Sequence, residues 1–191
     1  MHYEQDGESR SFSCDRLVST IPATILGSML GHDFSLRFQP VTLVYLLFDK
    51  ASVMPYHWIY FGDGDVVINR MAEFKNFARG DVPEDRTVVV AEVTTPTDDP
   101  QGDVLEAFER YGLARRDEVL DSLLIHESFG YPVYDRHYEL AVEEARSVFG
   151  ALDNLHLVGR NAEFRHIEVD EDLVSAMNLV RHLTAERAAK D

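Results

Sequence analysis

Apolar and polar positions along the chain follow two periods, one typical of strands and one typical of helices. Short apolar or alternating stretches bounded by glycine, proline or aspartate predict strands at about residues 14–22, 41–48, 56–61, 65–71, 87–94, 123–129 and 155–158. Asp6-Gly7 adds a hairpin turn before the first of these. Apolar residues spaced by three and four predict a helix that ends at Leu30 and further helices over 99–112, 137–149 and 171–183.

Two of the predicted helices carry more specific signals. Asp99-Pro100 opens one of them with an acidic cap and a proline in its first turn. The last helix carries a regular apolar stripe, which we expect to face the core: Leu173, Ala176, Met177, Val180 and Leu183.

The order of these elements predicts an α+β fold with a largely antiparallel sheet and flanking helices. The two ends differ in character from the middle, because the first is a strand that ends in Ser-Thr-Ile-Pro and the second is a strand, a loop and a helix. We therefore expect three segments, 1–31, 32–150 and 151–191, of which the outer two contribute strands and a helix to a neighbouring domain.

Composition and charge exclude several classes of function. With 45% hydrophobic and 27% charged residues, the 191-residue chain can bury a core, and its longest apolar run, residues 41–48, is too short to span a bilayer. The polar N-terminus is unlike a signal peptide, so we expect a cytoplasmic protein without a membrane span. The net charge of −16 disfavours nucleic acid as a partner. One cysteine and eight scattered histidines predict neither a disulfide nor a metal site.

The strongest chemical signal follows the predicted strand at 155–158. Gly159 and Arg160 come directly after it, and a polar loop through His166 leads into the last helix near Asp170. Glycine allows close backbone approach, arginine offers five donors, and a helix start offers unpaired N–H groups, which together could bind an anion. The alternative is an ordinary strand-to-helix connection with Arg160 in a surface ion pair.

This stretch resembles the C-terminal flavin motif of UDP-galactopyranose mutase, where Gly159, Arg160, Ala162, Glu163 and Phe164 match the pattern. The pattern departs at three positions, since His166 stands for tyrosine and Glu168-Val169 for Asp-Met. Related flavin amine oxidases have Gly-Arg-Asn-Gly before the same helix. The resemblance implies FAD as cofactor, an arginine near the flavin ring, and contacts to FAD from Gly159, Arg160, His166, Glu168, Val169 and Asp170.

Three further stretches resemble the same flavoproteins in the same order. Residues 130–135 are similar to Ala-Tyr-Pro-Val-Asn-Asp, which implies that Tyr131 lies beside substrate and flavin. Residues 68–77 resemble the stretch whose arginine points at the substrate diphosphate, which implies that Arg70 binds an anionic small molecule. Residues 15–22 resemble the strand that precedes the substrate domain. The alternatives are an aromatic packed at a strand end for Tyr131 and an ion pair with Glu73 or Asp65 for Arg70. Trp58 is either a core residue or a wall of the substrate pocket.

The resemblance implies the C-terminal, substrate-side portion of an FAD-dependent oxidoreductase or mutase, with residues 32–150 as its substrate-binding domain and Arg160 and Tyr131 at the reaction centre. No glycine-rich dinucleotide fingerprint occurs in the sequence. We therefore expect that the N-terminal FAD domain is missing, that the isolated chain does not hold FAD tightly, and that it is inactive alone. The alternative is a non-catalytic module with the same fold that binds a small ligand or a protein. Under either interpretation, a homo-oligomer is a candidate assembly.

Overall fold

The computed structural model describes residues 2–77 and 83–188, and they form the predicted α+β fold. The chain divides into two compact units. Gln39–Tyr131 forms the first, which we call the sheet unit, and Met1–Phe38 with Pro132–Asp191 forms the second, the terminal unit. These boundaries differ from the expected ones, because residues 32–38 and 132–150 belong with the ends of the chain. The reason is a shared core, in which Phe34 and Leu36 pack with Ala141, Val142 and Phe149.

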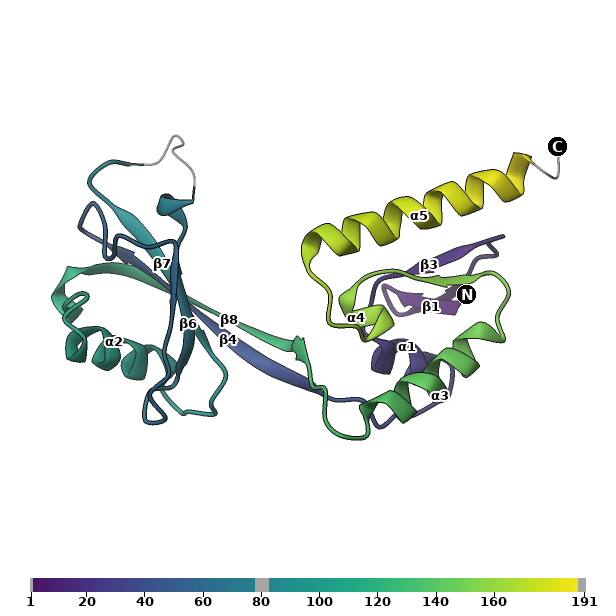
Figure 1. The fold of residues 1–191 in the computed structure, drawn as a ribbon, viewed down its shortest axis with the longest axis horizontal. Coiled ribbons are helices and arrows are strands. Elements are labelled where there is room, and N and C mark those ends of the chain that lie inside the picture. Colours follow the sequence, from purple (N-terminus) through teal and green to yellow (C-terminus); the bar gives the residue numbers. More distant parts are fainter. Residues whose placement is uncertain (1, 78–82, 189–191) are drawn as a thin grey trace. The chain divides into compact units, whose positions relative to one another are not determined.

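The sheet unit contains a five-stranded sheet in the order β5-β6-β7-β4-β8 (Figure 1). Its strands are β4 (Phe38–Phe48), β5 (Trp58–Tyr60), β6 (Ile68–Glu73), β7 (Thr87–Val93) and β8 (Val119–Pro132). The pairs β4–β7, β5–β6 and β6–β7 are antiparallel, as predicted. Strands β5 and β6 are shorter at their facing ends than the sequence suggested, so Gly62-Asp63-Gly64 lies within a longer loop.

One face of this sheet packs against helix α2 (Pro100–Arg110). The helix begins as predicted, with the Asp99 side chain accepting from the Gly102 N–H and Pro100 in the first turn. On β4, β6 and β7, strand alternation places buried residues on the helix side. The shared core consists of Val44, Leu46, Phe48, Met71, Val89, Ala91, Val104 and Phe108, with further apolar neighbours.

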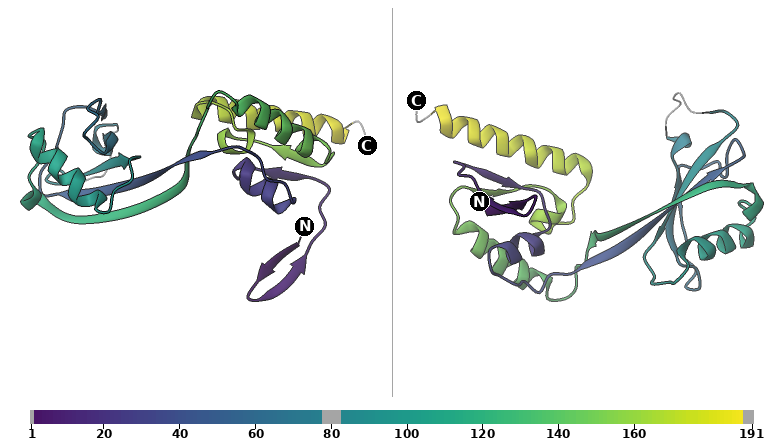
Figure 2. Two further views of the ribbon diagram at one scale, coloured as in Figure 1. Left: turned by 90° about the horizontal axis from the view of Figure 1, so that it is seen from below. Right: turned by 180° about the vertical axis from the view of Figure 1, so that it is seen from behind.

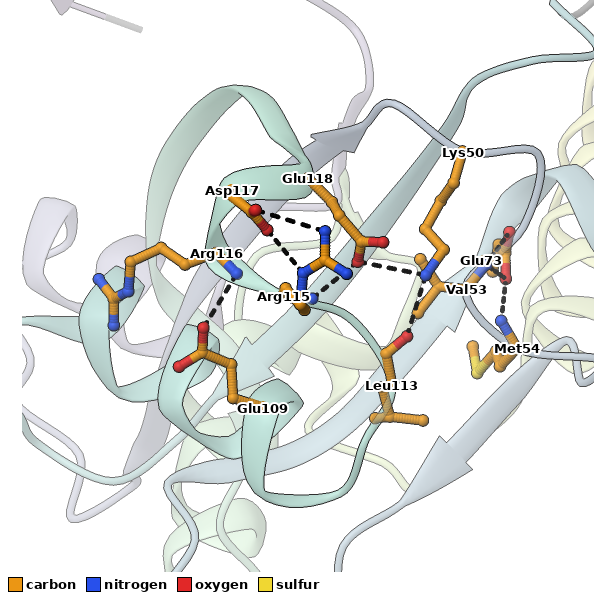
Figure 3. A network of polar contacts seen from close by, with 10 residues as sticks. All are labelled: Lys50, Val53, Met54, Glu73, Glu109, Leu113, Arg115, Arg116, Asp117 and Glu118. Carbon is orange, nitrogen blue, oxygen red and sulfur yellow. Dashed lines mark hydrogen bonds and ion pairs between the residues drawn. The ribbon is translucent and has the colours of Figure 1, made fainter.

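Polar contacts fix the connections around this core (Figure 3). Lys50, just after β4, contacts the Glu118 carboxylate at 3.3 Å and the Leu113 carbonyl at 3.4 Å, so the end of β4 is tied to the one-turn helix η2 (Arg116–Glu118). On β6, the fully buried Glu73 accepts from the backbone N–H groups of Val53 and Met54. A second short helix, η1 (Phe74–Asn76), follows directly.

The terminal unit is built around a parallel pair, β3 (Leu17–Ser19) and β9 (Leu155–Leu157). Helices α1 (Ala23–Met29) and α3 (Tyr138–Gly150) supply most of its core, and α4 (Arg160–Glu163) and α5 (Val169–Ala188) follow β9. Near the N-terminus, β1 (His2–Gln5) and β2 (Glu8–Ser11) form the predicted hairpin across Asp6-Gly7, a separate ribbon whose strand residues are all exposed (Figure 2).

Helix α5 corrects one prediction. It forms over the expected residues and extends beyond them, but its apolar stripe does not face the core: Leu173, Met177 and Val180 are all more than half exposed. The helix is attached instead by polar contacts, in which Arg16 donates to the Leu183 carbonyl at 3.0 Å and pairs with Glu186 at 2.9 Å. Apolar spacing predicted the helix correctly, but the surface that would cover its stripe is not among the described residues.

Candidate functional site

The candidate residues fall into two groups, one in each unit. Trp58, Arg70 and Tyr131 belong to the sheet unit, and Gly159, Arg160, His166, Glu168, Val169 and Asp170 belong to the terminal unit. Each group is described within its own unit.

In the sheet unit, strand register brings the candidates to one face. Tyr60 pairs with Arg70, Arg70 with Glu92, and Glu92 with Leu43, so these four side chains form a row across β5, β6, β7 and β4. Directly paired residues point to the same face of a sheet. The neighbouring row, which contains Met71, Ala91 and Val44, points the other way, into the core under α2. Arg70 therefore lies on the face opposite the helix.

Glu92 connects Arg70 to Tyr131. Oε1 of Glu92 accepts from Nε of Arg70 at 3.1 Å and from its Nη2 in a shorter contact, while the Tyr131 hydroxyl donates to Oε2 at 2.8 Å. The hydrogen bond to Glu92 raises the pKa of Arg70. Burial, followed by the hydrogen bond to Glu92, raises the pKa of Tyr131. Nη1 of Arg70 also reaches the Tyr60 hydroxyl at 3.5 Å. We call Tyr60, Arg70, Glu92 and Tyr131 the Glu92 cluster.

Trp58 shares this face, because it lies two residues before Tyr60 on β5 and pairs with Ala72 on β6. Its side chain is about half exposed, at 48%, and stacks on Phe77 with the ring centroids 5.5 Å apart. Trp58 is therefore not a core residue. Its exposed ring leaves the pocket-wall interpretation open.

In the terminal unit, β9 ends in the turn that the sequence singled out. Gly159 has φ +102° and ψ 154°, a backbone conformation that residues other than glycine rarely adopt. Arg160 begins the single turn of α4. Phe164 ends this turn in a left-handed backbone conformation (φ 49°), and its side chain is buried. Because β3 and β9 are parallel, the connections after both strands leave at the same edge, and α1 packs against α4 there.

Aromatic rings hold this turn in place. Phe164 packs edge-on against Phe38 and Tyr134, at centroid distances of 5.3 and 5.6 Å. The Tyr134 ring also contacts His166 at 5.7 Å. Burial raises the pKa of Tyr134, and Arg160, which lies close to its hydroxyl, partly offsets that rise. The structure thus places Arg160 beside Tyr134.

The other predicted cofactor residues lie further along the same segment. His166 lines a cavity of about 450 Å³ together with Tyr134, Tyr138, Phe164 and Arg165. Glu168, Val169 and Asp170 are exposed, and the Glu168 N–H donates to the Glu171 carboxylate at 2.9 Å. The first N–H at the start of α5 is therefore bonded within the chain.

Among the buried polar atoms without a hydrogen-bond partner in residues 2–77 and 83–188, two lie on the helices next to the turn. They are Oγ1 of Thr24, on α1, and Oδ1 of Asp172, in the first turn of α5. Buried polar groups are nearly always hydrogen-bonded in folded proteins. A hydroxyl and a carboxylate of this kind fit a ligand that carries both hydroxyl and N–H groups.

Sequence reasoning missed Glu92 and a second cavity. Glu92 stands at an alternating position of a predicted strand, and nothing local marks it as the partner of a residue 22 positions away. The cavity, of about 460 Å³, is lined by Thr42, Thr94, Thr95, Thr97 and His126 of the sheet unit, together with other residues. Hydroxyl-bearing residues at the end of a strand were the only signal for it.

Within residues 2–77 and 83–188, no group of His, Cys, Asp and Glu side chains is arranged to hold a metal ion. In the same part of the chain, no helix combines the length and the apolar character needed to cross a bilayer.

No protein-family model and no curated protein matches the chain. Solved structures do share its fold. A candidate protoporphyrinogen oxidase from Exiguobacterium superposes on 97% of the chain with a TM-score of 0.68 and 17% identity. Reduced UDP-galactopyranose mutase superposes on 82% with a TM-score of 0.68 and 18% identity. A Pyrococcus furiosus protein superposes on 95% with a TM-score of 0.52 and 13% identity.

The chain spans less than half the length of each of these proteins, namely 46%, 38% and 43%. At such identities the likeness establishes a common fold. The fold expected from the resemblance to UDP-galactopyranose mutase is therefore confirmed.

Proposed function

We propose that the chain forms the substrate side and part of the flavin site of an FAD-dependent oxidoreductase related to the amine oxidases and UDP-galactopyranose mutase. The observation that carries the proposal is the turn after β9. There Gly159, with φ +102°, is followed by Arg160 at the carboxyl edge of a parallel strand pair, in a chain whose fold UDP-galactopyranose mutase shares. In open α/β sheets, ligands bind at that edge.

The residues around this turn fit FAD. Gly159 leaves its surroundings open, since a Cβ built on it would meet no described atom within 4 Å. The Thr24 hydroxyl and the Asp172 carboxylate offer a donor and an acceptor to a ligand that has ring N–H and ribityl hydroxyl groups. When bound, FAD would supply the transfer of electrons or hydride.

Arg160 would provide a fixed positive charge at this edge. Its guanidinium lies beside the Tyr134 hydroxyl, and the Tyr134 ring packs against Phe164. A cation held in this way stabilises negative charge that develops next to it without having to reorganise. In the sheet unit, Trp58, Arg70 and Tyr131 would face the substrate, because register and hydrogen bonds place them on one sheet face.

The proposal is tested by the flavin content of the native protein. The protein, with any chain that copurifies with it, is isolated from its own cells and denatured, and the released flavin is identified by chromatography and fluorescence. We expect one FAD for each copy of this chain. Native protein without flavin would contradict the proposal and favour a non-catalytic binding module.

The 191-residue chain alone makes a sharper comparison. The glycine-rich turn that binds the pyrophosphate of FAD in such folds is not part of its sequence. We expect the purified chain to be colourless, with no flavin absorbance after gel filtration. A stoichiometric yellow protein would show that this chain alone forms the whole flavin site.

A further inference from the structure

The Glu92 carboxylate occupies one of the two paired-donor edges of the Arg70 guanidinium. Nε and Nη2 form one edge of the guanidinium, and both donate to Oε1 of Glu92. Arginine binds carboxylates and phosphates through paired donors of this kind. The Glu92 side chain is only 14% exposed, whereas that of Arg70 is 33% exposed. The positive charge of Arg70 is therefore already paired with a carboxylate of the protein itself.

Two further features oppose the binding of an anion. Tyr131 donates to the second oxygen of Glu92 at 2.8 Å, which holds the carboxylate in place. An anion would have to displace a partner that is tethered by strand pairing and hence present at a high effective concentration. The net charge of −16 adds a repulsive field.

We propose that Glu92 is the residue that sets the charge selectivity of this face, so that it binds ligands without negative charge and rejects anions. This inference rests on the proposed function, in which the face meets the substrate. It reverses the expectation that Arg70 holds an anionic substrate. The exposed rings of Tyr60 and Trp58 lie on the same face as Glu92. Tyr60 stands in the same row as Glu92, and Trp58 lies two residues before Tyr60 on β5. A planar organic ligand fits against these two rings.

Benzamide and benzoate are suitable probes, because they have the same ring and nearly the same size but differ by one negative charge. Trp58 is a built-in reporter: it is the only tryptophan in the sequence and lies two residues from Tyr60. Titrations that follow its indole N–H signal by NMR give the affinity of each probe at this face. They require neither flavin nor turnover, so a negative result here leaves the flavin test of the proposed function unaffected.

We expect the wild-type chain to bind benzamide more tightly than benzoate. Glu92→Gln should bind benzoate roughly ten- to a hundredfold more tightly than wild type does, because the freed guanidinium gains a charged hydrogen-bonding partner. Adding Arg70→Gln to Glu92→Gln should abolish that gain. Asp65→Asn is the matched control, because it removes one carboxylate from a different ion pair of the sheet unit, with Arg110 at 2.7 Å. It should leave the benzoate affinity at Trp58 unchanged.

The proposal is overturned if wild type binds benzoate at least as well as benzamide, or if folded Glu92→Gln gains no affinity for benzoate. An equal gain in Asp65→Asn would also overturn it, because the effect would then be one of overall charge. If circular dichroism shows that Glu92→Gln is unfolded, two other measurements decide the question. They are the preference of wild type between the two probes and the benzoate affinity of Arg70→Gln. A benzamide preference with benzoate binding unaffected by Arg70→Gln supports the proposal. Loss of benzoate binding in Arg70→Gln, or no benzamide preference in wild type, overturns it.

Discussion

The Tyr131 hydroxyl donates a hydrogen bond of 2.8 Å to Oε2 of Glu92, the carboxylate whose other oxygen is held by Arg70. Strands β6, β7 and β8 each contribute one residue to this contact, although β4 lies between β7 and β8 in the sheet. The long tyrosine side chain bridges that strand. Arg70 and Tyr131 therefore act through a common partner, and their effects on stability and binding should be coupled.

Stability measurements should reveal this coupling. Arg70→Ala leaves a mostly buried carboxylate without its cation, which should lower the free energy of unfolding of the sheet unit by about 1–2 kcal/mol, a value reduced because Arg70 is one-third exposed. Glu92→Gln should lower it as well, and the double variant should lose less than the sum of the two. Urea unfolding followed by Trp58 fluorescence measures all three. Strictly additive losses would show that the ion pair contributes nothing to stability.

Tyr131 should make stability depend on alkaline pH. Its folded-state pKa is raised above the ordinary 10.0 by burial and by the Glu92 hydrogen bond, so the protonated hydroxyl is favoured in the fold. Its contribution is complete below about pH 10, the unfolded value, and is lost as the pH rises through the raised folded value. Tyr131→Phe should be about 1 kcal/mol less stable at neutral pH, and the difference should shrink above pH ~10.

Unfolding curves of wild type and Tyr131→Phe between about pH 7 and pH 12 check this prediction. Tyr56→Phe, a change of the same kind at an exposed tyrosine of the sheet unit, is the control. Parallel stability curves for wild type and Tyr131→Phe across this range would refute the assignment.

Local chemistry explains which elements could be predicted from the sequence. Asp99-Pro100 marks a helix start for two reasons that both act within one turn. The aspartate caps a nearby N–H, and the first turn of a helix does not use the backbone N–H that proline lacks. The partner of Arg70 was harder to predict. Glu73 and Asp65 are near in sequence, but strand parity places Glu73 on the opposite face, and Asp65 pairs with Arg110. The actual partner, Glu92, becomes a neighbour only through the register of β6 with β7.

Burial was less predictable than secondary structure. The spacing of Leu173, Met177 and Val180 correctly predicts helix α5, yet all three side chains are exposed. Periodicity reports which side of a helix is apolar, but the surface that covers that side depends on tertiary structure. The candidate site shows the same division, because Gly159 and Arg160 are contiguous and were found as a motif, whereas the Glu92 cluster assembles from separate strands.

Glu73 should be essential for the stability of the sheet unit. Its fully buried carboxylate accepts from the Val53 and Met54 N–H groups and from the Thr87 hydroxyl, with bonds of 2.7–3.1 Å. Glu73→Gln preserves the size but turns an amide NH₂ toward those donors, so we expect a loss of about 2–3 kcal/mol. Chemical denaturation measures this loss. Glu106→Gln, at an exposed position of α2, should change stability by less than about 0.5 kcal/mol. Equal effects of the two substitutions would contradict the proposed role of the buried carboxylate.

Gly159 and Gly150 form a matched pair for testing backbone strain. A Cβ at either position would meet no described atom within 4 Å, so neither alanine creates a clash. They differ in conformation, because Gly159 has φ +102° whereas Gly150 belongs to α3. Gly159→Ala should therefore destabilise the terminal unit by about 1–3 kcal/mol, whereas Gly150→Ala should be neutral or stabilising by up to about 1 kcal/mol. Thermal unfolding of both variants makes the comparison, and similar shifts in Tm would show that the turn tolerates a side chain.

Arg160 supports the most direct test of the flavin site. A guanidinium beside Tyr134 at the carboxyl edge of β9 would stabilise negative charge on reduced flavin more than it stabilises the oxidised form. Removing it should lower the reduction potential of the bound flavin. For a two-electron couple, about 30 mV corresponds to about 1.4 kcal/mol, so a partly buried charge should shift the potential by several tens of millivolts.

The measurement is a redox titration of the flavin-containing protein. The Arg160→Met variant is compared with wild type. Arg165→Met is the matched control, because Arg165 lies on the same segment but pairs with Glu163 at 3.4 Å and is about half exposed. Its potential should stay close to that of wild type. If Arg160→Met retains FAD at an unchanged potential, Arg160 does not act on the ring, and the role inferred from the mutases does not apply to this residue. If both variants shift the potential equally, the effect comes from the overall charge of the segment, because the two substitutions remove the same charge.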